Sequence, residues 1–333
     1  MGVKAYAAKG PKQPLEPFEY EPGPLGPHEV EVKVSHCGIC HSDLAMIDND
    51  WGFSAYPLVP GHEVIGTVQA VGSEVDALTV GQRVGVGWSC NSCGRCEWCV
   101  KGLESFCSQN QPTIVHHHGG WAESVRAHWK FAVPIPEGLD SSVAGPLMCA
   151  GSTVFSPMLH YGVNASMKTA VVGIGGLGHL AVQFLAAFGC EVTAISSSHS
   201  KDDEARQMGA SHFIATKGTD ELKAAAGTFD FIISTVAADL PWADYVGALR
   251  PQGRLCLVGI PDSDLKFPAF PLLADRSVSG AQVGSPSDTA KMLDFAARKG
   301  VRPIIESFPM AEVNKALDHL RAGKARYRIV LQA

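Results

Sequence analysis

Five cysteines lie within one short stretch of the chain and could hold a metal ion. They are Cys90, Cys93, Cys96, Cys99 and Cys107. Cysteines separated by two residues can direct their sulfurs at one ion from a tight turn, and four thiolates make a closed tetrahedral zinc site. Because five cysteines compete for four positions, we favour Cys93, Cys96, Cys99 and Cys107 and set Cys90 aside. A site with four sulfurs has no open position, so we expect it to hold a loop in shape.

Two alternatives fit this cluster less well. Free buried cysteines are disfavoured because Arg95, Glu97 and Lys101 make the loop polar. A zinc-ribbon module that binds nucleic acid normally has two separated cysteine pairs and a basic face, and this sequence has neither. The formal net charge of -6 also argues against a nucleic-acid partner.

A second set of metal-ligand residues is spread along the chain. Cys40 lies in GICHSD, His62 and Glu63 lie in PGHE, and Cys149 lies in PLMCAG. Each alone is weak evidence, since a lone cysteine is usually a core residue. Together, two thiolates and one imidazole suit a catalytic zinc with its fourth position open to water or substrate. Glu63 could be an alternative or transient fourth ligand, and Asp43 could accept the other ring N–H of His62.

An open zinc site predicts chemistry on oxygen. Zinc lowers the pKa of a bound water or alcohol from about 16 to about 7, which favours hydride loss from an alcohol. In the reverse direction, the ion polarises a carbonyl towards hydride attack. The hydroxyl of Ser42, two residues after Cys40, could carry the alcohol proton away.

A glycine-rich turn predicts a dinucleotide site. Gly173, Ile174, Gly175, Gly176, Leu177 and Gly178 follow the apolar strand TAVV and open an apolar helix. In this strand–turn–helix setting, the backbone can approach a pyrophosphate at the helix N-terminus.

The next strand predicts the type of dinucleotide. It ends in ISSSHSK, without the acidic residue that usually binds the ribose hydroxyl of NAD. The hydroxyls of Ser196, Ser197 and Ser198 and the ammonium of Lys201 suit a 2′-phosphate. We therefore expect NADP(H), although a solvated serine-rich loop would have the same composition.

The elements that must position these residues fall into two groups, as the length of 333 residues suggests. Residues 1 to about 150 are typical of a glycine-rich, irregular β-domain, and EVEVKVSHCG alternates like a half-buried strand. After residue 150, short apolar strands such as FDFIISTV and GRLCLVGI alternate with helical segments at 202–208 and 242–249. This alternation predicts an α/β fold with a parallel sheet covered on both faces. From residue 300, a short helix at 311–321 and a last strand complete the chain.

The chain termini and the cysteines suggest a location. We see no signal peptide and no membrane span, so we expect no membrane partner. Clustered cysteines in a chain without an export signal favour metal binding in a reducing compartment. We therefore expect a cytoplasmic protein.

Together these motifs resemble the zinc-containing medium-chain alcohol dehydrogenases, and most of all the cinnamyl alcohol dehydrogenase branch with its bacterial aldehyde reductases. The resemblance covers essentially the whole chain. It implies a GroES-like, β-rich catalytic domain formed by residues 1–150 and 300–333. It places a Rossmann NADP-binding domain with a doubly wound parallel sheet at residues 151–299. It also implies two zinc ions per chain and a homodimer or homotetramer.

The resemblance assigns roles to individual residues. The catalytic zinc goes to Cys40, His62 and Cys149, and the structural zinc to Cys93, Cys96, Cys99 and Cys107. Ser42 becomes a proton-relay hydroxyl that also touches the nicotinamide ribose, with His41 near the pyrophosphate and Thr153 against the nicotinamide ring. The further cofactor contacts that it implies are Thr235, Val236, Gly259, Ile260, Ala281, Gln282 and Val283.

One position departs from the family pattern. Many relatives read C-H-[ST]-D-L-H, where the last histidine ends the proton relay, whereas this chain has Ala45 there. The relay must then end in water or in another base such as His41. We expect slower alcohol oxidation near neutral pH and a bias towards carbonyl reduction.

Large apolar residues near the motifs predict the substrate. The expected pocket wall consists of Trp51, Phe53, Trp88, Trp121, Leu147 and Ile260, which suits an aromatic, allylic or medium-chain alcohol or aldehyde. The run His116–His118 is interpreted as a surface loop without a role. A zinc protein that binds NADP(H) only for sensing or regulation remains an alternative, but it would not need the open ligand set. A zinc-free quinone reductase would generally lack both the cysteine cluster and the GHE ligand.

Overall fold

The computed structural model describes residues 2–261 and 263–333. Contacts between Cα atoms divide the chain into two compact units. The first unit runs to Ser152 and resumes at Gly284, and the second unit spans Thr153–Val283. Each candidate metal group lies within the first unit, and the glycine-rich turn lies within the second.

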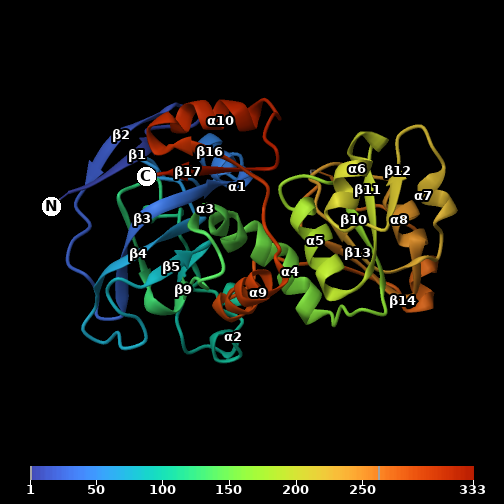
Figure 1. The fold of residues 1–333 in the computed structure, drawn as a ribbon, viewed down its shortest axis with the longest axis horizontal. Coiled ribbons are helices and arrows are strands. Elements are labelled where there is room, and N and C mark those ends of the chain that lie inside the picture. The colour runs from blue at the N-terminus through green and yellow to red at the C-terminus, as the bar shows by residue number, and fades with distance from the viewer. Residues whose placement is uncertain (1, 262) are drawn as a thin grey trace. The chain divides into compact units, whose positions relative to one another are not determined.

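The first unit is built on a seven-stranded sheet with the order β16-β17-β3-β4-β5-β9, in which β8 also pairs with β3 (Figure 1). Two small antiparallel pairs, β1-β2 and β6-β7, accompany it. The strands are β1 (Val3–Ala8), β2 (Leu15–Tyr20), β3 (Glu29–Ile39), β4 (Val64–Val71), β5 (Arg83–Val86), β6 (Ser89–Asn91), β7 (Gln111–Pro112), β8 (Ser124–His128), β9 (Ala132–Pro134), β16 (Ile305–Pro309) and β17 (Arg328–Gln332).

Strand β3 shows why this sequence forms a sheet. Its valines Val30, Val32 and Val34 are buried, while the residues between them are at least partly exposed. This alternation places one face of the strand in the core of the unit. The last residues of β3 are buried on both faces, and they lead directly to Cys40.

Short helices fill the connections of the first unit. They are α1 (His41–Asp48), α2 (Glu97–Val100), η1 (Glu104–Phe106), η2 (Trp129–Phe131), α3 (Ser141–Ala144), η3 (Gly145–Met148), α9 (Pro286–Lys299), η6 (Met310–Glu312) and α10 (Val313–Arg321). Helix α1 was not expected from periodicity. Its start is fixed locally by Asp43, whose carboxylate accepts the backbone N–H of the N-cap residue Cys40.

The second unit contains a six-stranded parallel sheet with the order β12-β11-β10-β13-β14-β15. Numbered within the unit, this order is 3-2-1-4-5-6, which is typical of a dinucleotide-binding sheet. The strands are β10 (Lys168–Val172), β11 (Glu191–Ser196), β12 (His212–Ala215), β13 (Phe229–Ser234), β14 (Leu249–Leu257) and β15 (Ser277–Gly280). The predicted α/β fold is therefore confirmed.

Helices connect the parallel strands of this sheet. They are α5 (Gly178–Phe188), η4 (His199–Lys201), α6 (Asp202–Gln207), α7 (Glu221–Ala224), α8 (Trp242–Ala248) and η5 (Phe270–Ala274). Helix α4 (Ala150–His160) precedes the first strand, β10. Helix α5 is apolar almost all round and largely buried. It ends at Gly189, whose φ of 89° is a left-handed conformation that glycine adopts without strain.

Helix α9 belongs to the first unit, whereas the sequence placed residues up to 299 with the cofactor domain. The physical reason is its packing. The residues at its start hydrogen-bond to Ser105 and Ser152 of the first unit, and Met292 is completely buried.

Among the described residues, no single helix has the length and apolar character needed to cross a membrane. Only the pair 141–148 and 150–160, bent by 56°, reaches that length and composition when taken together.

Candidate metal centres and cofactor site

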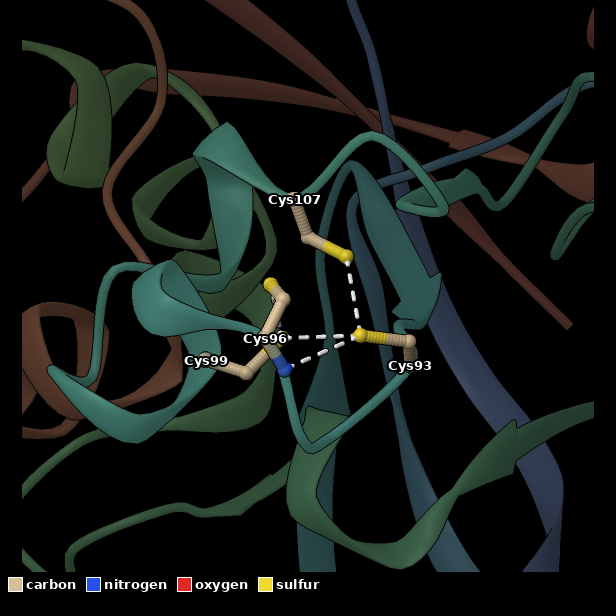
Figure 2. Close-up of side chains that lie close together, drawn as sticks. All are labelled: Cys93, Cys96, Cys99 and Cys107. Atoms are coloured by element: carbon tan, nitrogen blue, oxygen red, sulfur yellow. Dashed lines mark hydrogen bonds between the residues drawn. The ribbon is translucent and has the colours of Figure 1, made fainter.

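The structure brings the four favoured cysteines together in one lobe (Figure 2). The Sγ atom of Cys93 lies 3.9 Å from that of Cys99 and 3.6 Å from that of Cys107, and the sulfurs of Cys96 and Cys99 are 3.5 Å apart. Sulfurs about 2.3 Å from one tetrahedral zinc ion would be about 3.8 Å from one another. The donor set therefore fits zinc in both chemistry and spacing.

Cys90 is not a member of this group. Its buried thiol points to the carbonyl oxygen of Gln111 at 3.5 Å. Burial raises the pKa of Cys90 to about 12, whereas backbone N–H groups of Arg95 and Cys96 lower the pKa of Cys93 to about 6. Thiolates bind metals, so these environments favour Cys93 over Cys90.

The second ligand set also comes together, although its members are far apart in sequence. Cys40 follows β3, His62 and Glu63 precede β4, and Cys149 lies between η3 and α4. Their ligand atoms all lie within 4.8 Å of one another. The side chains of Cys40, His62 and Glu63 are fully or almost fully buried.

Asp43 organises two of these ligands. Its buried carboxylate accepts N–H groups from the backbone of Cys40, the backbone of Gly61 and the ring Nδ1 of His62, each at 2.9 Å. Since a carboxylate only accepts, Nδ1 of His62 carries a proton, and Nε2 is the ring nitrogen available to a metal ion. This confers the ring orientation that a metal-binding histidine requires.

Two unpartnered atoms test whether a metal fits here. Nε2 of His62 and Oε2 of Glu63 are buried and have no hydrogen-bond partner among the described residues. Such atoms are costly in a protein interior unless something binds them. Two thiols, one imidazole and one carboxylate oxygen meeting at this point match the donor preferences of zinc.

Arg328, which sequence reasoning missed, completes the surroundings of this group. Its side chain is only 5% exposed, and its Nη2 donates to Oε1 of Glu63 in an ion pair. Arg328 begins β17, 265 positions after Glu63. No local sequence signal indicated the contact, because an arginine in a terminal strand is usually a surface residue.

The group is strongly coupled electrostatically. A hydrogen bond from Cys149 lowers the pKa of Cys40 well below its usual range, and the same contact raises the pKa of Cys149. Burial acts to lower the pKa of His62, but Asp43 outweighs it, and the pKa is raised. Burial raises the pKa of Glu63 to about 7, against the opposing charge of Arg328. A bound dication would favour the metal-binding form of all four groups.

The expected proton-relay residues lie on the first turn of α1. Oγ of Ser42 is 3.8 Å from Sγ of Cys40, and the side chain is partly exposed. His41 is exposed, and Ala45 is partly exposed on the next turn. The hydroxyl is therefore beside the ligand group and can exchange its proton with solvent.

Aromatic side chains extend from His62 towards solvent. The ring of Trp88 meets that of His62 edge-on at 5.0 Å between centroids, and Trp51 lies 6.0 Å from Trp88. Phe53 stacks on Trp51 at 5.8 Å, and both are more than 40% exposed. Ser54 fixes this loop to α1 by donating to the carbonyl oxygen of Met46 at 2.6 Å.

Trp121 and Leu147 differ from their expected place in the pocket wall. Both are 0% exposed to solvent. Trp121 packs in the core of the first unit and lines a cavity of about 860 Å³ beside β1 and β16, whose lining includes no residue of the metal group. Core packing attracts large apolar side chains as strongly as a pocket does.

The glycine-rich turn has the geometry expected of a dinucleotide cradle. Gly173 has a φ of 86°, and a Cβ there would lie 2.2 Å from Val236. A Cβ at Gly178 would lie 1.7 Å from the carbonyl oxygen of Gly173. A Cβ at Gly175 would meet nothing within 4 Å, which leaves its backbone open to a ligand at the N-terminus of α5.

The other expected cofactor residues, apart from Thr153 in α4, follow the carboxyl ends of strands of the same sheet, where ligands bind in such folds. Thr235 follows β13 and donates to the carbonyl oxygens of Val172 and Gly173 at 3.0 Å, which supports the turn. Nζ of Lys201 donates to the carbonyl oxygen of Ile174 at 2.5 Å. The remaining ones follow β11, β14 and β15 or open the unit, and they are Ser196–Ser198, Gly259, Ile260, Ala281–Val283 and Thr153.

Within the run His116–His118, the rings of His117 and His118 have separate partners. Nδ1 of His117 lies 3.1 Å from the carbonyl oxygen of Thr113, and the ring of His118 lies 3.9 Å from that of Tyr20. These contacts give the run a packing role and do not gather it into a metal group.

Comparison with known proteins identifies both halves of the chain. Residues 26–137 match the profile of the alcohol dehydrogenase GroES-like domain, and residues 176–298 match that of the zinc-binding dehydrogenase domain. The chain is 50% identical over 330 residues to the aldehyde reductase AdhA of Synechocystis sp., covering 99% of this chain and 98% of that protein.

Solved structures agree with this. A cinnamyl alcohol dehydrogenase from Sorghum bicolor superposes with a TM-score of 0.95 at 40% identity, covering 100% of this chain and 98% of that one. The cinnamyl alcohol dehydrogenase of Helicobacter pylori, solved in complex with NADP(H), gives 0.91 at 29% identity with the same coverage.

Proposed function

The chain belongs to the zinc-containing medium-chain alcohol dehydrogenases, as an alcohol dehydrogenase/aldehyde reductase, and we propose that it uses two zinc ions and NADP(H) to interconvert apolar alcohols and aldehydes. The observation that carries the proposal is the meeting of Cys40, His62 and Cys149 within one buried group. The unpartnered Nε2 of His62 supports a metal there. The lobe of Cys93, Cys96, Cys99 and Cys107 would hold the second, structural ion.

Each residue around the proposed open site would have a separate role. When bound, zinc would polarise the oxygen of an alcohol or carbonyl, and NADP(H) would accept or supply hydride. Asp43 holds the ring of His62 in the metal-binding tautomer. Arg328 donates to Oε1 of Glu63, while Oε2 of Glu63 stays within the ligand group as an alternative fourth donor. Ser42 would take up or release the alcohol proton at its Oγ.

Two features support the choice of cofactor and substrate. The end of β11 carries hydroxyls and Lys201 but no carboxylate for a ribose hydroxyl, which favours a 2′-phosphate. The aromatic residues Trp51, Phe53 and Trp88 would exclude water and favour an aromatic, allylic or medium-chain substrate. The relative from Helicobacter pylori, whose structure holds NADP(H), supports the same cofactor.

We further propose a homo-oligomer, a dimer or a tetramer, in the cytoplasm. Strand β15 pairs only with β14 among the described residues, and Phe270 and Leu273 beside it are 81% and 80% exposed. An open strand edge with large exposed apolar side chains favours association with a second copy. Thiolate metal sites require a compartment that keeps cysteines reduced.

The test combines metal analysis with kinetics. We expect two zinc ions per chain and aldehyde reduction with NADPH at least about tenfold more efficient than with NADH. Cys149→Ala should remove one zinc ion and abolish turnover. The matched control is Cys90→Ala, a buried cysteine outside both groups, which should keep both ions and the activity. Equal use of NADH, or turnover by Cys149→Ala, would contradict the proposal.

A further inference from the structure

The N-terminal end of helix α9 is hydrogen-bonded to the four-cysteine lobe. Ser285, the N-cap residue, is 2% exposed, and its Oγ accepts the backbone N–H of Ser105 at 3.1 Å. The hydroxyls of the two serines are also 3.0 Å apart. Ser105 lies in η1, two residues before Cys107. One residue into the helix, Ser287 donates to the carbonyl oxygen of Gly102 at 3.2 Å, which adds a second contact with the lobe.

The hydroxyl of Ser285 is used in an unusual way. An N-cap serine normally accepts a backbone N–H from the first turn of its own helix. Among the described residues, the side chain of Ser285 makes no such bond, and its oxygen instead accepts the backbone N–H of Ser105 in the lobe. The buried contact with Ser105 therefore links the start of α9 to η1 in addition to marking where the helix begins.

One turn further along, α9 contacts the segment that carries Cys149. Oγ1 of Thr289 lies 2.9 Å from Oγ of Ser152, and both side chains are at most 5% exposed. Ser152 is three residues after Cys149, in the first turn of α4. The packing is close as well, since a Cβ at Gly151 would lie 3.2 Å from Sδ of Met292.

We propose that the N-terminal end of α9 is a positioning element that couples the four-cysteine lobe to the Cys149 side of the open metal site. Ser285 and Thr289 are its positioning residues, and the path runs from η1 through Ser285 and Thr289 to Ser152. A metal ion in the lobe would fix η1, and the buried bonds would carry that constraint to Cys149 because close-packed contacts transmit displacement. The inference rests on the proposed function. It gives the closed four-sulfur site a role in positioning Cys149 at the open metal site.

The experiment follows zinc release to a chromogenic chelator. We expect two kinetic phases of zinc release, with one ion in each. Cys149→Ala and Cys107→Ala should each remove one phase and so assign it to a site. Thr289→Val keeps the shape but loses the hydroxyl, and it should speed release from the Cys149 site by about three- to tenfold. This is somewhat below the ~10–100-fold effect of groups that bind a metal ligand directly. Thr289→Ser should behave like the unaltered protein. Thr169→Val, a buried threonine of the second unit that also loses a hydrogen bond, is the matched control and should leave both phases unchanged.

A double-mutant cycle separates coupling from general loosening. Emptying the lobe with Cys107→Ala should speed release from the Cys149 site in the normal background, with little further effect in Thr289→Val. Equal acceleration in both backgrounds, or unchanged release in a normally folded Thr289→Val, would overturn the inference. If Thr289→Val folds poorly, Ser285→Ala interrupts the same path from the lobe side and should give the same acceleration. Two bound ions with independent release would refute only this coupling, whereas absence of zinc or of NADPH turnover would refute the proposed function.

Discussion

Removing Arg328 should destabilise the first unit and impair the open metal site at the same time. Glu63 is fully buried, Arg328 is 5% exposed, and the two form an ion pair. Breaking a buried pair by deleting one partner costs about 3–5 kcal/mol, because the other charge remains without compensation. The pKa of Glu63 is already raised to about 7 by burial with the arginine present, so it should rise further in Arg328→Met.

The assay is chemical denaturation of the zinc-loaded protein together with steady-state kinetics. We expect Arg328→Met and Glu63→Gln each to lower the free energy of unfolding by about 3–5 kcal/mol, and the double variant to lose at least about 2 kcal/mol less than their sum. The control is Arg321→Met, which removes an ion pair with Asp48 whose arginine is 40% exposed and should cost at most about 1 kcal/mol. Losses that add in the double variant would refute the reasoning. In Arg328→Met, Glu63 also loses the contact that positions its carboxylate beside the ligand group, so kcat should fall as well.

Three further predictions concern the cofactor, the proton relay and pH. Lys201→Gln should raise KM for NADPH about 10–100-fold with little change for NADH, because it removes a charged donor to the 2′-phosphate; equal effects on both cofactors would contradict this. Ala45→His should speed alcohol oxidation near neutral pH by supplying a base after Ser42, and an unchanged pH–rate profile would show that the position has no part in the relay. Burial raises the pKa of Tyr245 from 10.0 to about 12, so the folded state keeps its proton while the unfolded state loses it. The contribution of Tyr245 to stability should therefore be complete below pH 10 and should fall by about 3 kcal/mol as the pH rises to 12. Denaturation midpoints should show a smaller loss of stability over this range in Tyr245→Phe.

The fold was predictable where the sequence pattern is local. The alternation in β3, the apolar strand before Gly173 and the apolar helix after it each report a short-range preference, and all three elements formed as expected. The contacts of helix α9 could not be predicted, because an amphipathic helix encodes which of its faces is buried but not which surface covers it. Its contacts with Ser105 and Ser152 are separated by more than 130 residues from its own sequence.

The candidate site divides in the same way. Cys40, His62 and Cys149 could be selected from the sequence because few residue types bind zinc and their combination is informative even when each is not. Arg328 could not, since its function depends on a partner 265 residues away. Trp121 could not be placed correctly either, because a large apolar side chain lines a pocket or fills a core for the same physical reason.

Charge distinguishes the two candidate ligand groups. Four thiolates around a dication leave a net charge of -2, which the lobe can tolerate because Cys93 and Cys96 are partly exposed and the exposed Arg95 and Lys101 belong to the same segment. The open group is buried, where an uncompensated charge is far more costly. There, the two thiolates of Cys40 and Cys149 would neutralise the dication, and Glu63 is neutralised separately by Arg328. A bond from Oε2 of Glu63 to the ion would leave its Oε1 paired with Arg328. The same ion pair that stabilises the fold therefore fixes one oxygen of Glu63 beside the ligand group, and in this way β17, at the end of the chain, helps to position the fourth candidate donor.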